Sequence, residues 1–237
     1  MIRDIMRFVR MVFVSWMPVW TLDHLREIRQ YEAIQVVGEL PHRSLVLEVG
    51  AGAGWQARIF ADLGRSVTPL EVHGSKYSRI SEVYIRYYDG EKIPYSGKLF
   101  DAVFTSNTLE HMPRVMAMQS EMQRVLIHMG IAVHVVPTAS WAFWTFLTTL
   151  FKWWRVPHAH GVHARNPIKE MFSYTRKAWE RLLLDAGWLV EKYHVNNIFY
   201  TGNSIFAGRL SLKSRVRLSR ILGSSCHIFV LRVNHES

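Results

Sequence analysis

The sequence predicts an α/β fold in which a doubly wound, mostly parallel sheet carries helices on both faces. Three observations support this prediction. Short apolar runs typical of buried parallel strands recur along the chain, and helical stretches separate them. A glycine-rich turn joins the first of these runs to a helix. The length of 237 residues suits one such domain with some additional elements.

The expected strands are short and rich in aliphatic residues. Seven are predicted, over residues 44–49, 66–72, 83–88, 100–106, 131–136, 188–194 and 226–233. Helical stretches are expected between them, over residues 55–63, 114–128 and 174–186. This alternation of strands and helices indicates a seven-stranded sheet of the doubly wound type.

An N-terminal helical segment, residues 1–40, is predicted to precede the main domain, residues 41–237. Within it, residues 2–14 read as a basic amphipathic helix, because arginines share one stripe and apolar side chains cover the remainder. Arginines also interrupt the apolar run, so no cleavable signal peptide is expected. This helix either lies on a membrane surface or packs on the domain with its arginines in solvent, and a second helix is expected over residues 22–39.

An aromatic helical insertion, at about residues 139–170, is expected after the fifth strand. Residues 140–155 read SWAFWTFLTTLFKWWR, and their polar side chains share one face at helical spacing. The apolar run 139–151 is too short to span a bilayer core of roughly 30 Å. A histidine-rich loop over residues 157–166 follows.

The amino-acid composition indicates which class of partner the protein binds and in which compartment it is expected. A formal net charge of +10 favours an anionic partner, and the nine tryptophans combined with basic residues suit a membrane interface better than nucleic acid. The single cysteine, Cys226, excludes an internal disulfide and a cysteine cluster. We therefore expect a cytoplasmic protein that contacts the inner face of the membrane peripherally.

The glycine-rich turn is the first motif that predicts a ligand-binding site. Residues 48–54 read EVGAGAG, so glycines stand at positions 50, 52 and 54, and Glu48 lies two positions before the first of them. Glycines permit a tight turn and close approach of a ligand to the backbone, and the following helix start offers amide donors. The spacing differs from the G-x-G-x-x-G pattern of dinucleotide enzymes.

Three further segments follow in register with this turn. Glu71 ends the second strand, residues 89–94 read DGEKIP after the third, and residues 100–111 read FDAVFTSNTLEH across the fourth. With these motifs, residues 44–137 resemble the class I S-adenosylmethionine-dependent methyltransferases, in particular the type 11 group with the loop E/D-x-G-x-G-x-G. The resemblance implies a Rossmann-like fold and S-adenosylmethionine as the cofactor.

The resemblance also implies the cofactor contacts. Its strand-two carboxylate binds the ribose hydroxyls, since a carboxylate accepts two hydrogen bonds from a vicinal diol. Its first residue after strand three accepts from the adenine amino group, and its strand-four motif lies beside the transferred methyl. The residues implied as cofactor contacts are Glu48, Gly50, Ala51, Gly52, Gly54, Glu71, Val72, Asp89, Gly90 and Asn107.

Two histidines are the candidate catalytic residues. His111 follows the fourth strand, where a general base could deprotonate an acceptor hydroxyl. His163 is the second, because HGVHA at 160–164, together with NIFYTG at 197–202, resembles methyltransferases encoded with bacterial polysaccharide genes. The histidines at 158, 160 and 163 also raise the alternative of a metal, but no carboxylate or cysteine is adjacent in sequence, so no metal site is predicted.

The leading functional prediction is O-methylation of a small or lipid-linked, glycan-type acceptor at the cytoplasmic membrane face. Methylation of an isoprenoid quinone-like lipid is an alternative, and a non-catalytic membrane or partner-binding protein is another. The aromatic elements could instead pack on one another or form a homodimer. A nucleic-acid acceptor is disfavoured, because the strand-four motif lacks the Asn/Asp-Pro-Pro-aromatic run typical of many amino-methylating enzymes.

Overall fold

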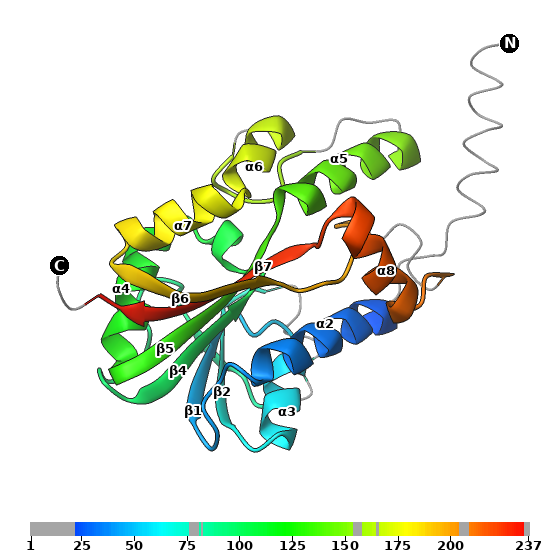
Figure 1. Cartoon of the computed structure of the whole chain (residues 1–237). Coiled ribbons are helices and arrows are strands. Elements are labelled where there is room, and N and C mark those ends of the chain that lie inside the picture. The colour runs from blue at the N-terminus through cyan, green and yellow to red at the C-terminus, as the bar shows by residue number, and fades with distance from the viewer. Residues whose placement is uncertain are drawn as a thin grey trace, which may run out of the picture.

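The computed structural model describes residues 22–75, 81, 83–153, 158–164, 166–203 and 209–234 (Figure 1). It contains the predicted seven-stranded sheet. The strands are β1 (Leu45–Val49), β2 (Ser66–Val72), β3 (Arg86–Tyr88), β4 (Phe100–Ser106), β5 (Leu126–Pro137), β6 (Trp188–Val195) and β7 (Cys226–Val233). The helices are α2 (Leu22–Val37), α3 (Trp55–Asp62), α4 (Val115–Val125), α5 (Ala139–Trp153), α6 (Pro167–Ser173), α7 (Arg176–Asp185) and α8 (Leu212–Leu222), with a 3-10 turn η2 (Leu109–His111).

The strands lie in the order β3-β2-β1-β4-β5-β7-β6. The pairs among β1 to β5 are parallel, whereas β7 runs antiparallel to both β5 and β6. The order reverses between β1 and β4. In open α/β sheets a ligand binds at such a reversal, outside the carboxyl ends of the strands. The topology therefore confirms the mostly parallel sheet and places the expected site at one edge.

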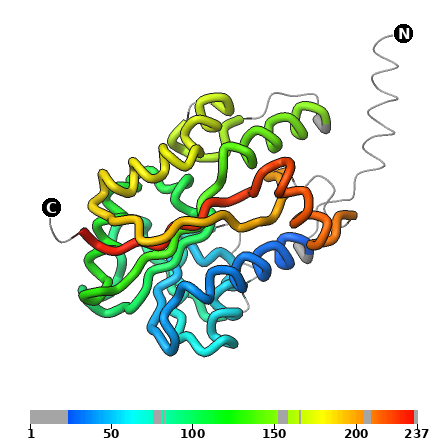
Figure 2. The backbone as a smooth tube through the Cα atoms, viewed as in Figure 1, coloured from blue at the N-terminus to red at the C-terminus, as the bar shows by residue number. Residues whose placement is uncertain are grey.

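Helices cover both faces of this sheet. Figures 1 and 2 show α2 and α3 on one face and α4 and α7 on the other, while α5 and α6 continue beyond the end of β5. The central strands β1, β4 and β5 are mostly apolar and buried, and Val46, Val103 and Val133 on them are fully buried. This agrees with strands that are covered on both sides.

His134, Thr105 and Gln119 form a buried hydrogen-bond network within the core on the α4 side, in which Gln119 Oε1 is paired and Gln119 Nε2 has no partner among the described residues. His134 on β5 contacts Thr105 Oγ1 through Nδ1 at 2.8 Å and Gln119 Oε1 through Nε2 at 3.2 Å. The indole of Trp188 donates to the same Gln119 oxygen at 2.7 Å. Complete burial lowers the pKa of His134 to about 3. This network ties β4, β5 and β6 to α4.

The structure corrects several expected boundaries. The third strand is shorter than expected, at Arg86–Tyr88, and the helix before the fifth strand ends at Val125 instead of residue 128. The chain joins the sheet at once, since Leu126 pairs with Phe100, and the register then shifts before Ile131 pairs with Ala102. Tertiary pairing with β4 has overridden the helical pattern of residues 126–128.

Two helices were not expected, although each starts at a recognisable cap. Asn166 Oδ1 accepts from the Lys169 amide at the start of α6, and Pro167 occupies the first turn. Ser211 Oγ accepts from the Ser214 amide at the start of α8. The predicted helix over residues 2–14 lies outside the described residues. Within the described ranges, no helix combines the length and the apolar character needed to cross a bilayer.

Candidate functional site

A cavity of about 630 Å³ opens at the carboxyl ends of the parallel strands. The loops after β1, β2, β3 and β4 form one wall. The opposite side is formed by α2, the start of α5, His160 and residues 200–202. Of the ten residues predicted to contact the cofactor, eight line this cavity, and Glu48 and Gly54 do not.

The glycine-rich turn fits closely into its surroundings. Gly50 has φ +80, and a Cβ added there would lie 2.2 Å from Thr108 Cγ2. Its amide donates to the carbonyl of Leu70 on β2 at 2.8 Å. The left-handed conformation and the lack of space both require glycine at this position. The turn can therefore pass close to the β4 segment and leave its backbone facing the cavity.

Glu71 at the end of β2 joins the second strand to the turn. Its Oε2 accepts from the Gly52 amide at 2.6 Å, and its Oε1 accepts from the Val72 amide at 2.8 Å. The side chain lines the cavity, and each carboxylate oxygen has a further lone pair for a ligand. These two amide bonds hold the carboxylate in place at the strand end.

Asp89 lies at the cavity wall after β3. Its Oδ1 accepts from the amides of Glu91 at 2.8 Å and Lys92 at 3.1 Å. These backbone hydrogen bonds lower the pKa of Asp89, so the carboxylate is charged at neutral pH. Gly90 follows with φ +82, and a Cβ there would lie 3.2 Å from Val72 Cγ1. Glycine thus lets this loop approach the end of β2.

Glu48 lies behind the turn. It is 2% exposed, and among the described residues its Oε2 has no hydrogen-bond partner. Burial raises the pKa of Glu48 to about 8, with a backbone hydrogen bond from Ala57 opposing and the charge of Glu71 adding to the rise. Burial thus favours the neutral form of Glu48, whose carboxyl group meets the backbone of α3 at Ala57.

Asn107 follows β4 in a left-handed conformation with φ +49. Its amide donates to the Val135 carbonyl at 2.8 Å, and its Nδ2 donates to Ser106 Oγ at 3.2 Å. Its Oδ1 accepts from the Cys226 thiol at 3.4 Å. These contacts direct the chain from β4 along the cavity wall toward η2.

The residues present fit S-adenosylmethionine. Carboxylates at the ends of two adjacent strands, Glu71 and Asp89, offer acceptors for hydroxyl and amino groups. Gln56 also lines the cavity, and its buried Nε2 has no partner in the described part of the chain. A polar ligand would satisfy such a donor.

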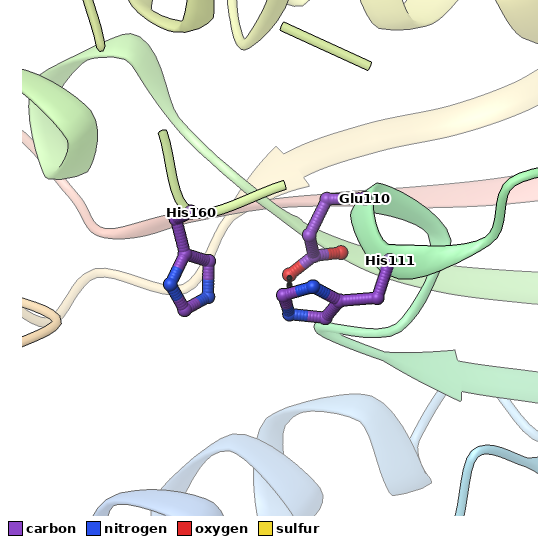
Figure 3. Close-up of side chains that lie close together, drawn as sticks. All are labelled: Glu110, His111 and His160. Atoms are coloured by element: carbon purple, nitrogen blue, oxygen red, sulfur yellow. Dashed lines mark ion pairs between the residues drawn. The ribbon is translucent and has the colours of Figure 1, made fainter. Parts of the chain in front are cut away.

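Glu110, His111 and His160 gather within a small volume beside the same cavity (Figure 3). His111 Nε2 lies 3.9 Å from Glu110 Oε1. The ring of His160 meets the ring of His111 edge to face at 4.7 Å and the indole of Trp141 at 4.9 Å. His111, His160 and Trp141 line the cavity, whereas Glu110 is buried behind them.

Burial decides the charge state of this group. It raises the pKa of Glu110 to about 8, although the positive charge of Arg29 opposes the rise. Burial, with smaller contributions from the charges of His111 and Arg29, lowers the pKa of His160 to about 4. Burial and the nearby His163 also lower the pKa of His111. The imidazoles of His111 and His160 are consequently neutral near pH 7.

The histidine-rich loop is fastened to η2 and α6. The Val162 amide donates to the Glu110 carbonyl at 2.9 Å. The amides of His160 and Gly161 both donate to Glu170 Oε1, at 2.5 and 2.6 Å. His163 does not line the cavity, and its Nε2 lies 3.2 Å from the Leu109 carbonyl. The loop thus presents His160 to the cavity, while a catalytic role for His163 stays a prediction.

Arg29 on α2 is a cavity residue that the sequence analysis missed. Its Nη1 donates to Glu32 Oε2 and lies 3.4 Å from Tyr200 Oη. Glu32 Oε1 accepts from Tyr200 Oη at 2.8 Å and from Asn196 Nδ2 at 2.9 Å. The sequence of α2 predicts a helix but does not indicate that Arg29 would reach the cavity. Only the packing of α2 against residues 196–200 brings the guanidinium to the cavity.

Residues 47–134 match a family model described as a methyltransferase domain. A methyltransferase of Mycobacterium avium (strain 104) is 33% identical over 103 residues, which are 40% of this chain and 40% of that protein. The chain spans about two fifths of the length of the curated relatives that it matches.

Solved structures share the fold. A chain of the complex between the Haloferax volcanii Trm112 methyltransferase activator and a methyltransferase superposes with a TM-score of 0.61 at 12% identity. The match covers 89% of this chain and 92% of that one. An S-adenosylmethionine-dependent methyltransferase from Mesorhizobium loti gives 0.56 at 16% identity, over 86% and 97% of the two chains.

The domain match coincides with the part of the chain that supplies Glu71, Asp89 and Asn107 to the cavity. Two of the solved structures with this fold, from Aquifex aeolicus and Mesorhizobium loti, are S-adenosylmethionine-dependent methyltransferases. Residues 47–134 therefore resemble a methyltransferase domain, and the sheet has the fold that the solved S-adenosylmethionine-dependent methyltransferases share.

Proposed function

We propose that this chain transfers the methyl group of S-adenosylmethionine to a hydroxyl of an acceptor bound beside His111, His160 and Trp141. The observation that carries this proposal is that the Glu71 and Asp89 carboxylates and the imidazoles of His111 and His160 line the same cavity. When bound, S-adenosylmethionine supplies an electrophilic methyl group. The protein has to hold the acceptor in line with that group and exclude water.

The imidazole end suits a hydroxyl acceptor, which has to lose its proton as the methyl is transferred. His111 lines the cavity and is neutral near pH 7, as a general base must be. The base role expected for His111 is thus part of the proposal. The indole of Trp141, which is 5% exposed, gives this end an apolar wall against which an acceptor can pack.

A glycan-type acceptor is favoured by a second hollow of about 290 Å³. It shares His160 and Gly202 with the main cavity. Its wall includes the side chains of Thr145, Thr149 and Asn203. Hydroxyl and amide groups of this kind can bind several hydroxyls of one sugar ring.

Calorimetric titration with S-adenosylhomocysteine tests the cofactor site. We expect one binding event per chain, and at least about a tenfold loss of affinity in Glu71→Ala, because the ribose hydroxyls lose their acceptor. Glu191→Ala removes a carboxylate of an exposed ion pair with Arg232 and should bind normally. Absence of binding by the unaltered protein would overturn the proposal.

We further propose that the acceptor is lipid-linked and that α5 and α6 contact an anionic membrane surface. The polar face of α5 is turned toward the protein. Thr145 Oγ1 accepts from the Gly202 amide, and Thr148 Oγ1 accepts from Asn203 Nδ2. Aromatic side chains of the two contacting helices are left exposed, with Phe143 at 46% and Phe172 at 71%.

Apolar side chains on this surface and the net charge of +10 both suit anionic lipid. Further exposed apolar side chains are Phe151 on α5 and Ile168 on α6. The alternative is a homodimer in which the same two helices are buried. The two possibilities can be distinguished by experiment, because a dimer would form without lipid.

Co-sedimentation with phosphatidylglycerol vesicles and with phosphatidylcholine vesicles tests this surface. We expect binding to the anionic vesicles, and a loss of at least about tenfold in the double variant Phe143→Ser/Phe172→Ser. Leu184→Ser is the matched control, because Leu184 is 54% exposed on α7, which is not one of the two helices of the proposed surface. Equal sedimentation of all three proteins, or a lipid-independent dimer that the double variant dissociates, contradicts membrane contact.

A further inference from the structure

We propose that Glu110, His111 and His160 bind a divalent first-row transition-metal ion at the acceptor end of the cavity. The class of ion follows from the donors. Two imidazole nitrogens and one carboxylate oxygen suit Zn²⁺, Fe²⁺, Mn²⁺ or Co²⁺ better than the all-oxygen sites of Ca²⁺. This departs from the sequence analysis, which predicted no metal site because no carboxylate stands next to the histidine-rich loop.

The first support is geometry. Each of the three side chains offers one ligand atom, and these atoms all lie within 4.8 Å of one another. Ligand bonds of about 2.0–2.2 Å place neighbouring ligands roughly 3 Å apart, so side-chain movements of about 1 Å would complete the site. Figure 3 shows the imidazole of His160 facing the Glu110 and His111 pair across a small gap.

The second support is the carboxylate itself. Glu110 is 1% exposed, and among the described residues its Oε2 has no hydrogen-bond partner. The cation that acts on it electrostatically, Arg29, is already paired with Glu32. A buried carboxylate is costly unless a cation or hydrogen bonds compensate its charge. A divalent ion would supply that compensation.

The third support is the arrangement behind the ligands. Glu170 accepts from the backbone amides of His160 and Gly161, and the hydroxyl of Tyr174 donates to the same oxygen at 3.2 Å. Glu170 and Tyr174 are 4% and 2% exposed. Groups that fix the position of a ligating residue are typical of metal centres. Because His111 and His160 also line the cavity, the free coordination positions of the ion would face the acceptor.

The ion's role rests on the proposed function, whereas the site rests on the three ligands alone. An acceptor hydroxyl bound to the ion would lose its proton to solvent water more readily, as water does on Zn²⁺. His111 would then be a ligand in place of a general base. Metal binding therefore distinguishes these two roles of His111.

The test uses the full chain, purified without a polyhistidine tag, stripped with a chelator and titrated with ZnCl₂ in a calorimeter. We expect one Zn²⁺ per chain with a Kd of about 1 µM or below. His160→Ala and Glu110→Gln should each weaken binding by about tenfold or more. His158→Ala is the matched control, because His158 is exposed in the same loop and lies outside the three-residue group. Substitution with Co²⁺ gives a second readout, since visible absorption bands report nitrogen and oxygen ligation.

Thermal melts of each variant check the fold, and S-adenosylhomocysteine is titrated into the stripped protein in parallel. Cofactor binding without Zn²⁺ binding overturns the metal site and leaves the proposed function standing. Zn²⁺ binding that His158→Ala weakens as much as His160→Ala also overturns it. Zn²⁺ binding without cofactor binding upholds the metal site and contradicts the proposed function instead.

Discussion

The imidazoles of His111 and His160 meet edge to face with ring centroids 4.7 Å apart, although η2 and the histidine-rich loop are distant in sequence. The contact exists because the loop is fastened to Glu110 and Glu170 by its backbone amides. It brings two histidines that are separate in sequence to the cavity that Glu71 also lines.

Gly161→Ala should displace the histidine-rich loop. A Cβ at this position would lie 2.5 Å from Tyr174 Oη and 2.7 Å from the Glu110 carbonyl, and both atoms belong to buried residues. We expect a loss of about 1–3 kcal/mol in the free energy of unfolding, measured by urea denaturation. Gly38→Ala is the matched control, because a Cβ there has nothing within 4 Å, and it should change stability by less than about 0.5 kcal/mol. Equal effects of the two substitutions would contradict the tight docking of the loop.

Gly50→Ala should weaken S-adenosylhomocysteine binding by at least about tenfold in calorimetry. The substitution strains a residue at φ +80 and places Cβ 2.2 Å from Thr108 Cγ2, so the turn must move away from β4. Gly64→Ala has a similar strain, at φ +83, but a Cβ there has nothing within 4 Å. Gly64→Ala should therefore cost stability and keep its affinity for the ligand. Equal affinity in both variants would show that the turn does not contact the cofactor.

Stability should fall as the solution becomes acidic, partly because of His134. Its pKa is lowered to about 3 in the folded protein, against 6.5 for an unperturbed histidine. Above pH 6.5 both the folded and the unfolded states hold it neutral. Below pH 6.5 His134 is protonated in the unfolded state but stays neutral in the folded state. The free energy of unfolding therefore decreases as pH falls from about 6.5 toward 3.

Urea denaturation at a series of pH values between about 7 and 5 measures this loss. His134→Gln should flatten the dependence, while His128→Gln, at an exposed position on the same strand, should leave it unchanged. His24, His160 and His227, whose pKa values burial also lowers to about 4, add to the slope, whereas Glu48 and Glu110, whose pKa values are raised to about 8, oppose it. An unchanged slope in His134→Gln would contradict the buried neutral ring.

Glu32→Ala should destabilise the protein by about 3 kcal/mol, because it leaves the positive charge of Arg29 without its buried partner. It also removes the acceptor for Tyr200 Oη and Asn196 Nδ2. Glu39→Ala breaks a more exposed pair with Lys192 and should cost less than about 1 kcal/mol. Chemical denaturation measures both. A small effect for Glu32→Ala would mean that α2 is held mainly by apolar contacts.

The sequence by itself was sufficient to predict the sheet and the cofactor end of the site. The strands are local apolar runs, and the residues at their carboxyl ends must meet at one edge once the sheet is parallel. Glu71, Asp89 and Asn107 could therefore be assigned from spacing and resemblance, and the structure places all three at the cavity.

Only the tertiary structure decided what stands opposite them. His160 reaches the cavity in place of His163 because Glu110 and Glu170 hold the backbone of its loop. Arg29 reaches it because Glu32 and Tyr200 fix α2 against the region after β6. These contacts join residues far apart in the chain, so no local pattern encodes them. The predicted cofactor contacts could be recognised because each of them follows the carboxyl end of a successive strand. The residues around His160 depend instead on how segments that are distant in the sequence pack together.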